Sequence, residues 1–368
     1  MEAEDRAKYL FLSLLQARVG SSLVSHLGHL APEAVLRTPV AELAGRAKIT
    51  KNASRAIEEL QRAFDPERMR ERLAAKGIVA LNPADAAYPK ALRSIPVPPP
   101  ALFVKGAVPD KVSVALVGSR KASSTGIETA RALGLALSER GVCVVSGLAL
   151  GVDAAAHEGA LEVGGLTVGV LGCGIDVVYP RSNRALFESV RRHGALVSEY
   201  YLGEAPLAWR FPARNRIIAG LAGTVVVVEA PEHSGALITA RHALDAGRDV
   251  WAVPGPPGVR ECRGSNGLLA DGAGVLWDIE EFVEAVASEW SVPAAGGGSG
   301  DVQPLPSGLP GTEAAVLRGV GFEPVGVDAV AKHSGVAMPE VLTALALLEL
   351  KGFVSRDAVG TYVRKAVL

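Results

Sequence analysis

The sequence contains only three cysteines, and they follow no pattern. Cys143, Cys173 and Cys262 are far apart, with neither Cys-x-x-Cys nor Cys/His ligand spacing. A disulfide framework or a metal centre normally needs such spacing, so neither is expected. We expect three small core residues in a protein of a reducing compartment.

Long apolar runs are also missing. The uncharged segment Val163–Ile175 is too short to cross a bilayer and is interrupted by glycines. The first ten residues carry acids where a secretory signal needs a basic region followed by an apolar one. These features predict a soluble cytoplasmic protein with no membrane partner.

An excess of charge of either sign is absent as well. The formal net charge of the 368 residues is −1, so a polyanion could be bound only by a local basic patch. Apolar residues make up 49% of the chain and charged residues 21%, which allows a large buried core. The length predicts two or three domains.

Two common nucleotide-binding motifs are missing. No Gly-Lys dipeptide occurs in the chain, which disfavours a P-loop. A dinucleotide site needs Gly-x-Gly-x-x-Gly after the first strand and an acid after the second, whereas the expected second strand ends in Ser146. Gly172-Cys173-Gly174 begins that fingerprint, but Val177 stands at its third glycine. No cofactor is therefore expected.

The middle of the chain repeats the order strand, glycine turn, helix. Predicted strands are Val112–Val117, Val142–Ser146, Thr167–Leu171, Ala195–Val197, Thr224–Glu229 and Val250–Val253. Predicted helices are Gly126–Arg140, Asp153–Val163, Arg184–His193, Ala213–Leu221 and Leu237–Ala246. This alternation predicts an α/β fold with a Rossmann-like, doubly wound parallel sheet over residues 73–290. Ligands of such sheets bind at the carboxyl ends of the strands.

The flanking regions have other patterns. Residues 1–72 alternate helical segments with turns such as Gly20-Ser21-Ser22 and predict a small helical domain. Residues 291–311 are rich in Gly, Pro and Ser and are expected to form a linker. Residues 312–368 show three helices and a hairpin, the winged-helix pattern. The third helix, Pro339–Lys351, is almost without donors, which favours protein contact over reading of a DNA groove.

The turn after the first strand of the repeat is a candidate anion site. The strand breaks into Gly118-Ser119-Arg120-Lys121 and a cluster of hydroxyl residues. Thr125 with Glu128 fits a capping box for the following helix. Such a turn presents free backbone N–H groups beside two cations. The alternative is an ordinary turn with Arg and Lys on the surface.

A second glycine loop runs from Ser146 to Asp153. Gly147 and Gly151 allow a close approach of the backbone, and Asp153 is expected to cap the next helix. His157 in that helix is a candidate catalytic base, although a structural histidine is favoured. Ser146 has no His/Asp partner motif, so no catalytic residue is predicted.

Basic and aromatic residues are concentrated in Trp209–Arg216. Three arginines and two aromatic residues occur there without an acid. Guanidinium groups bind phosphates and, like aromatic rings, stack on exposed bases, so this composition suits single-stranded nucleic acid. The alternative is a surface loop whose arginines pair with acids such as Glu199 and Glu229.

Together these motifs resemble the DNA-processing protein A (DprA/Smf) family. Eight segments carry the resemblance, namely Val117–Arg120, SGLALGVDAAAHEGAL at 146–161, Tyr179–Asn183, Ser198–Tyr200, FPARNRIIAGLA at 211–222, VVVVEA at 225–230, SGALITARHAL at 234–244 and WAVPGP at 251–256. The resemblance extends from about Tyr88 to Ala273. The helical N-terminal part (similar to SAM or helix-hairpin-helix domains) and the winged-helix-like tail match the family's usual arrangement.

The resemblance implies a non-enzymatic protein that binds single-stranded DNA through an extended Rossmann-like domain, commonly as a homodimer. It further implies protection of incoming strands in natural transformation and loading of the RecA recombinase. By position, Arg120 matches the family's pocket arginine, Arg181 and Asn183 fall in its YPxxN loop, and Arg214 and Arg216 fall in its FPxRNR motif. Leu150 stands where several relatives have a basic residue, so one phosphate contact is expected to be missing or supplied elsewhere.

The expected DNA-binding set combines these positions with the glycine turns. It is Gly118, Ser119, Arg120, Lys121, Gly147, Arg181, Asn183, Arg214, Asn215 and Arg216.

Two other functions stay open on the sequence. Ala219–Glu229 loosely resembles the PGGxGTxxE motif of nucleoside-monophosphate phosphoribohydrolases, although the Pro-Gly-Gly opening is absent and the acid comes two residues late. A Rossmann-like nucleotide hydrolase is therefore the main alternative. A sequence-specific regulator would need a more basic winged-helix domain than this one.

Overall fold

The computed structural model describes residues 3–19, 27, 32–40, 42, 50–289, 311–320, 325–351, 353–356 and 361–364. The chain divides into two compact units, Met1–Val292 and Pro293–Leu368. Among the described residues, no helix is long and apolar enough to cross a membrane.

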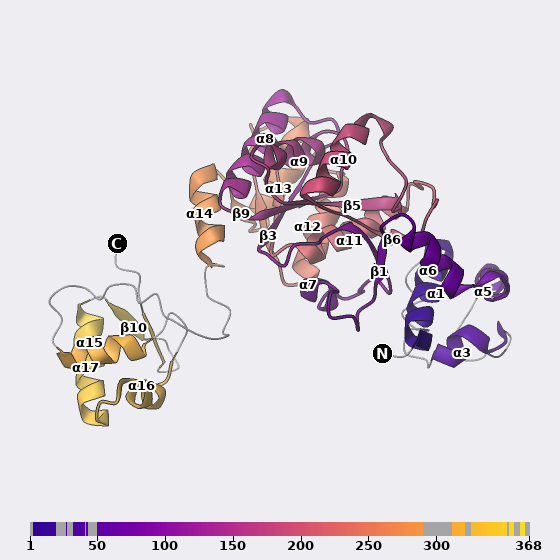
Figure 1. Cartoon of the computed structure of the whole chain (residues 1–368). Helices are drawn as coiled ribbons and strands as arrows, with labels where there is room; N and C mark the ends of the chain where they lie inside the picture. The colour runs from indigo at the N-terminus through magenta and orange to yellow at the C-terminus, as the bar shows by residue number, and fades with distance from the viewer. Residues whose placement is uncertain are drawn as a thin grey trace. The chain divides into compact units, whose positions relative to one another are not determined.

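In the described part of the first unit, a nine-stranded sheet forms the centre (Figure 1). Its strands are β1 (Val79–Leu81), β2 (Leu102–Gly106), β3 (Ser113–Val117), β4 (Cys143–Ser146), β5 (Thr167–Gly174), β6 (Gly194–Tyr200), β7 (Thr224–Val227), β8 (Asp249–Ala252) and β9 (Gly274–Val275). Their order across the sheet is β1-β2-β6-β5-β4-β3-β7-β8-β9. The pairs β1–β2 and β2–β6 are antiparallel, and the other neighbours are parallel.

The predicted Rossmann-like arrangement is confirmed. All six strands predicted between residues 112 and 253 are present, with small shifts at their ends. The chain adds β4, β5 and β6 on one side of β3 and then crosses to place β7 on its other side. The boundary between the neighbouring strands β3 and β7 is therefore the topological switch point. Ligands of such sheets bind there, beyond the carboxyl ends of the strands.

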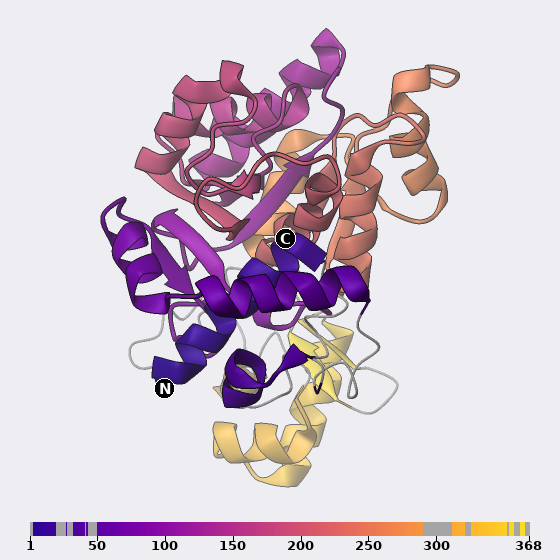
Figure 2. The same cartoon turned by 90° about the vertical axis from the view of Figure 1, so that its right-hand side faces the viewer.

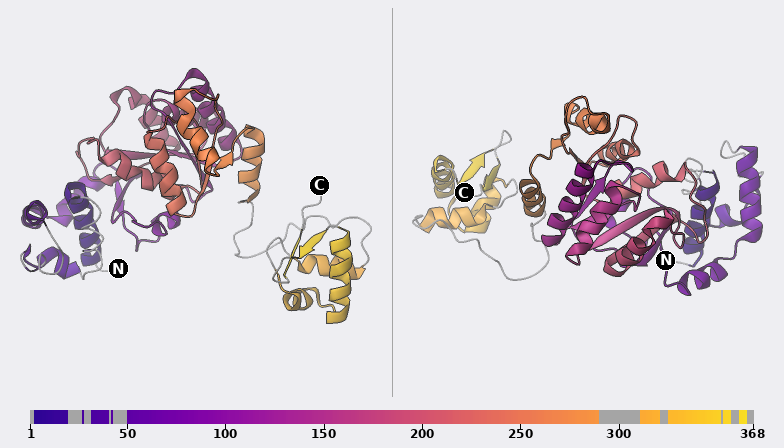
Figure 3. Two further views of the ribbon diagram at one scale, coloured as in Figure 1. Left: turned by 180° about the vertical axis from the view of Figure 1, so that it is seen from behind. Right: turned by 90° about the horizontal axis from the view of Figure 1, so that it is seen from above.

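Helices cover both faces of the sheet (Figure 3). On one face, α8 (Ser124–Glu139), α9 (Val152–Glu162) and α14 (Ile279–Glu289) bury Val114 and Leu116 of β3. On the other face, α11 (Arg210–Leu221) and α12 (Gly235–Asp245) bury Ala115 and Val117. Alternate β3 side chains thus enter opposite cores, which explains why the strand is apolar throughout. The remaining helical elements of this region are α7 (Lys90–Arg93), η1 (Arg181–Asn183), α10 (Arg184–His193), η2 (Arg260–Cys262) and α13 (Arg263–Ala270).

The caps of two helices differ from the predicted ones. Ser123, not Thr125, caps α8, because its hydroxyl accepts a backbone N–H of the first turn at 3.0 Å. Gly151 precedes α9 with a φ of 77°, a left-handed conformation that favours glycine. Asp153 lies inside the first turn of α9, and its carboxylate accepts the Gly147 N–H at 3.1 Å. Asp153 therefore stabilises the glycine loop rather than capping the helix.

The N-terminal helices lie against one edge of the sheet (Figure 2). They are α1 (Ala3–Val19), α3 (Pro32–Arg37), α5 (Lys51–Ala63) and α6 (Pro66–Ala74). Phe11 and Leu15 of α1 share a buried cluster with Phe103 of β2 and Leu196 of β6. These helices and the sheet are thus joined by a continuous apolar core. The predicted turn at Gly20-Ser21-Ser22 lies outside the described residues.

The second unit has the predicted winged-helix elements. These are α15 (Gly311–Gly319), α16 (Val327–Ser334), α17 (Met338–Leu350) and the antiparallel strands β10 (Val354–Arg356) and β11 (Tyr362–Arg364). Val316, Leu345 and Tyr362 belong to its own buried core. The predicted linker, apart from Gly311, lies outside the described residues.

Candidate nucleic-acid interface

A cavity of about 780 Å³ opens at the switch point between β3 and β7. Its walls include Gly118–Lys121 after β3, residues of α11, the loop after β7 with the start of α12, and Arg260 and Glu261 after β8. The loops after β3, β7 and β8 leave the carboxyl ends of parallel strands. The cavity therefore lies where doubly wound sheets bind their ligands.

The turn after β3 is fixed by its backbone. The Ser119 N–H donates to the Glu229 carbonyl at 2.7 Å, and the Ser119 carbonyl accepts the Val152 N–H at 3.2 Å. A Cβ at Gly118 would lie 2.5 Å from the Val152 side chain, so glycine permits this close approach. Arg120 and Lys121 are exposed, and neither forms an ion pair with any described residue. The turn thus holds two available cations in a rigid frame.

Arg214 is a buried cation in the wall of the cavity. It is 3% exposed, and its Nη1 donates to the carbonyls of Gly147, at 2.8 Å, and Val170. Its Nε donates to Asn215 Oδ1 at 3.3 Å, and its Nη2 makes no hydrogen bond within the described part of the chain. A Cβ at Gly147 would lie 2.5 Å from the guanidinium, so Gly147 leaves the space that Arg214 fills.

Burial shifts the pKa values of two groups here. Desolvation lowers the pKa of Arg214 to about 10, although the Asp153 carboxylate opposes the shift. Desolvation also raises the pKa of Asp153, although Arg214 and hydrogen bonds from two backbone N–H groups act to lower it. An anion in the cavity would stabilise the charged form of Arg214.

Arg120, Phe211 and Tyr179 lie against one another in the cavity wall. The guanidinium carbon of Arg120 lies 5.1 Å from the centre of the Phe211 ring. The Tyr179 ring lies 5.4 Å from that of Phe211 at an angle of 40°. Tyr179 is 42% exposed, which leaves surface on which an unpaired base can stack.

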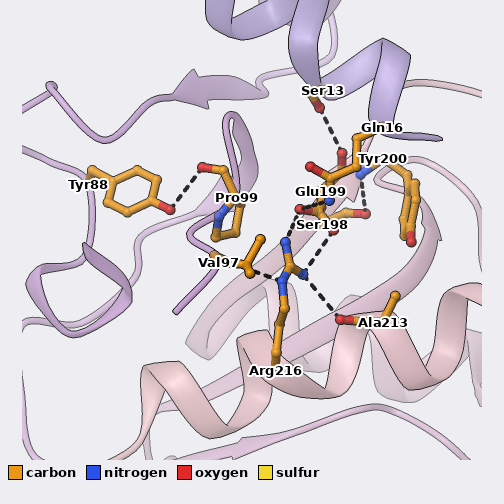
Figure 4. A network of polar contacts seen from close by, with 10 residues as sticks. All are labelled: Ser13, Gln16, Tyr88, Val97, Pro99, Ser198, Glu199, Tyr200, Ala213 and Arg216. Atoms are coloured by element: carbon orange, nitrogen blue, oxygen red, sulfur yellow. Dashed lines mark hydrogen bonds and ion pairs between the residues drawn. The ribbon is translucent and has the colours of Figure 1, made fainter. Parts of the chain in front are cut away.

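Arg216 does not line the cavity. Both Nη atoms contact the Glu199 carboxylate, Nη1 at 3.0 Å from Oε2 and Nη2 against Oε1, and Nε donates to the Val97 carbonyl at 3.0 Å (Figure 4). The two side chains are 11% and 1% exposed. Arg216 thus forms a buried ion pair with Glu199, the alternative left open on the sequence for this arginine. Asn215 does line the cavity, and it ties α11 to α12 through the Gly235 carbonyl at 3.0 Å.

Arg181 and Asn183 lie in the η1 turn after β5. Arg181 is exposed and follows Tyr179 by two residues. Asn183 Nδ2 donates to the carbonyls of Leu148, at 3.1 Å, and Ala149, at 3.4 Å, so it fixes the second glycine loop. Leu150 in that loop is 47% exposed, so the loop presents an apolar side chain at this position.

His157 and Ser146 are structural residues. His157 is fully buried, with Nδ1 2.6 Å from Thr167 Oγ1, and burial lowers its pKa to about 3. The Ser146 hydroxyl donates to the Leu116 carbonyl at 2.6 Å. Among the described residues, no group of three or more His, Cys, Asp and Glu could hold a metal ion. The three cysteines are free and buried.

Arg260 is a cavity residue that the sequence analysis missed. It is exposed in η2 and forms no ion pair within the described ranges, and Glu261 beside it also lines the cavity. The loop follows β8, which was predicted as a parallel strand. The position of Arg260 at the carboxyl ends of the parallel strands could therefore have been inferred from the sequence.

Comparison with known proteins agrees with this fold. A family model for DNA recombination-mediator protein A matches residues 80–287, and one for the DprA winged helix domain matches residues 302–358. The chain is 42% identical over 292 residues to protein Smf of Escherichia coli (strain K12), which covers 77% of each chain. It is 35% identical over 258 residues to DNA processing protein DprA of Bacillus subtilis (strain 168), covering 69% of this chain and 86% of that protein.

Comparison with solved structures also finds DNA processing protein A. DNA processing protein A of Streptococcus pneumoniae has a TM-score of 0.62 and 32% identity, covering 76% of this chain and 97% of that one. DNA processing protein A of Helicobacter pylori, solved to show a single-stranded DNA binding mode, has a TM-score of 0.53 and 28% identity, covering 58% and 97%. The fold defines a Rossmann-like α/β protein with a winged-helix unit. The chain belongs to the DNA recombination-mediator protein A (DprA/Smf) family.

Proposed function

We propose that this protein binds single-stranded DNA, without sequence preference, at the cavity beyond the carboxyl ends of β3 and β7. The observation that carries the proposal is the contact of Arg120 with Phe211 and Tyr179 in the cavity wall, beside Lys121 and Arg260, which form no ion pair with described residues. Cations neutralise phosphates and planar groups stack on bases, which is how single strands are held without base readout.

The expected residues take different roles in this proposal. The side chains of Arg120, Lys121 and Arg181 contact phosphates, and Arg214 adds a buried positive charge. Backbone groups of Gly118 and Ser119 shape the cavity, and Gly147 leaves the space for Arg214. Asn183 and Asn215 hold the surrounding loops and helices, and Arg216 anchors α11 through Glu199 instead of contacting DNA.

The wider role follows from family membership. We propose that the protein acts as a cytoplasmic homodimer that protects incoming strands in natural transformation and loads the RecA recombinase, without catalysing a reaction. The winged-helix unit would contact protein, because α17 contains no Lys or Arg and exposes Met338, Leu342 and Leu347.

The nucleotide hydrolase alternative depends on Glu229 as its acid. Glu229 is 5% exposed and accepts the N–H of Ser123 at 2.9 Å as well as its hydroxyl. Its carboxylate therefore stabilises the start of α8 and does not line the cavity. Steady release of free base from nucleoside monophosphates would favour the hydrolase over the binding protein.

Binding of labelled single- and double-stranded oligonucleotides across a salt series tests the proposal. Tighter binding of the single strand is expected, with log K falling against log salt by about 0.7 per phosphate contacted. Arg120→Ala should weaken binding and reduce that slope by about 0.7. Arg140→Ala is the matched control, because it removes the same charge at the far end of α8. Equal binding by both folded variants would contradict the proposed site.

A further inference from the structure

Helix α1 is attached to the end of β6 by buried polar contacts. Ser13 Oγ donates to the Glu199 carbonyl at 2.9 Å, and Gln16 Nε2 donates to Glu199 Oε1 at 2.7 Å. The three residues are at most 5% exposed. Ser13 and Gln16 are three residues apart, so they lie on one face of α1, and Figure 4 shows both reaching Glu199.

The same carboxylate holds α11. Glu199 Oε1 accepts from both Gln16 and Arg216, and Oε2 accepts from Arg216. A second link joins the two helices directly, because Arg210 Nη2 donates to the Ala17 carbonyl at 3.1 Å. α1 therefore contacts α11 near its first residue and, through Glu199, half-way along it.

Most of the cavity residues of α11 lie between these two anchors, and Ile218 follows the second one. Phe211 stacks with Arg120, Arg214 contacts Gly147, and Asn215 contacts the start of α12. A helix moves largely as a rigid body, so a change at an anchor displaces these side chains together. Binding sites lose affinity when the groups that support their contact residues are loosened.

We propose that Gln16, acting through Glu199, is a positioning residue for the DNA-binding cavity. Helix α1 fixes the placement of α11, and so sets the affinity for single-stranded DNA, although none of its described residues lines the cavity. This inference rests on the proposed function of the cavity.

Gln16→Met in the full chain tests the proposal. Methionine has a similar volume and cannot donate to Glu199. It also removes Gln16 Oε1, a buried atom without a partner among the described residues, so little change in stability is expected. Binding of a fluorescent oligothymidylate must then also hold α11 in place, which should weaken it by up to the net contribution of the lost bond, about 2- to 10-fold. The salt slope should not change, because no phosphate contact is lost. Amide hydrogen exchange in residues 210–221 should become faster.

Gln61→Met is the matched control. Gln61 Nε2 donates to the carbonyls of Val35, at 3.2 Å, and Thr38, at 3.1 Å, so its bonds stay within the N-terminal helices. This variant should bind the oligothymidylate like the wild type. An equal loss of affinity in both variants would assign the effect to the general stability of these helices and overturn the proposal.

Other outcomes separate this inference from the proposed function. Wild-type affinity in Gln16→Met, together with weaker binding by Arg120→Ala, would overturn the positioning role alone. A reduced salt slope in Gln16→Met would indicate a lost phosphate contact and would also overturn it. A wild-type protein that does not bind the oligothymidylate would overturn the proposed function itself.

Discussion

At the scale of single residues, Tyr179 supplies exposed aromatic surface in the cavity. Because stacking of a base on an aromatic ring contributes about 1–3 kcal/mol, Tyr179→Ala should weaken oligothymidylate binding by about 5- to 150-fold. The salt slope should stay the same, since no cation is removed. Trp277→Ala, which removes a ring that is 70% exposed but outside the cavity lining, is the control. Similar binding by the two variants in a polarisation titration would exclude Tyr179 from the interface.

Arg260 should act as a phosphate contact of the same interface. Removing its charge in Arg260→Ala should weaken binding and lower the salt slope by about 0.7. Arg263→Ala provides the comparison, because Arg263 is also exposed but does not line this cavity. An unchanged slope in Arg260→Ala would exclude Arg260 from the phosphate contacts.

His157 should make stability depend on pH. Burial lowers the folded-state pKa of His157 to about 3 from 6.5, so the unfolded chain binds the proton first as the pH falls. This residue should therefore cost the folded protein about 1.4 kcal/mol per pH unit below about pH 6.5. Urea unfolding between pH 7 and pH 5 should show a smaller loss of stability for His157→Asn than for the wild type. Parallel losses in the two proteins would show that other groups cause the dependence.

At the scale of the element, α11 shows which features could be predicted from the sequence and which could not. The strands were predictable because runs such as Val225–Val228 are apolar on both faces, as a buried parallel strand requires. The helix was expected to begin at Ala213, but it begins at Arg210. Arg214 and Arg216 therefore lie in the second turn and not at the start of the helix, and they are about 200° apart around its axis. Only one of them can face the cavity, and the motif alone does not show which.

The ion pair between Glu199 and Arg216 should be essential to the packing of α11. Glu199→Gln leaves a buried guanidinium without its counter-charge and should lower the free energy of unfolding by about 3–5 kcal/mol. The double variant Glu199→Gln with Arg216→Met removes both charges and should recover much of this loss. Urea titrations of the single and double variants make the comparison. A double variant that is less stable than Glu199→Gln would contradict this account.

At the scale of the whole molecule, the cavity is built by the first unit alone. All of its lining residues lie between Val117 and Glu261, and the winged-helix unit has its own core. A chain ending at Val292 should therefore bind oligothymidylate within about 2-fold of the full chain, with the same salt slope. A large loss of affinity in this truncated protein would give the winged-helix unit a direct part in DNA binding.

The crossing of the chain from β6 to β7 has a consequence for biosynthesis. The turn at Gly118–Lys121 leaves the ribosome more than a hundred residues before the loops after β7 and β8, which complete the same cavity. At about 5–20 residues per second, this interval lasts on the order of 5 to 20 seconds. During that time β3 has no β7 partner, so an apolar strand edge is open to other nascent chains. A growing chain thus carries Arg120 but has no assembled cavity, and the proposed DNA binding requires a finished first unit.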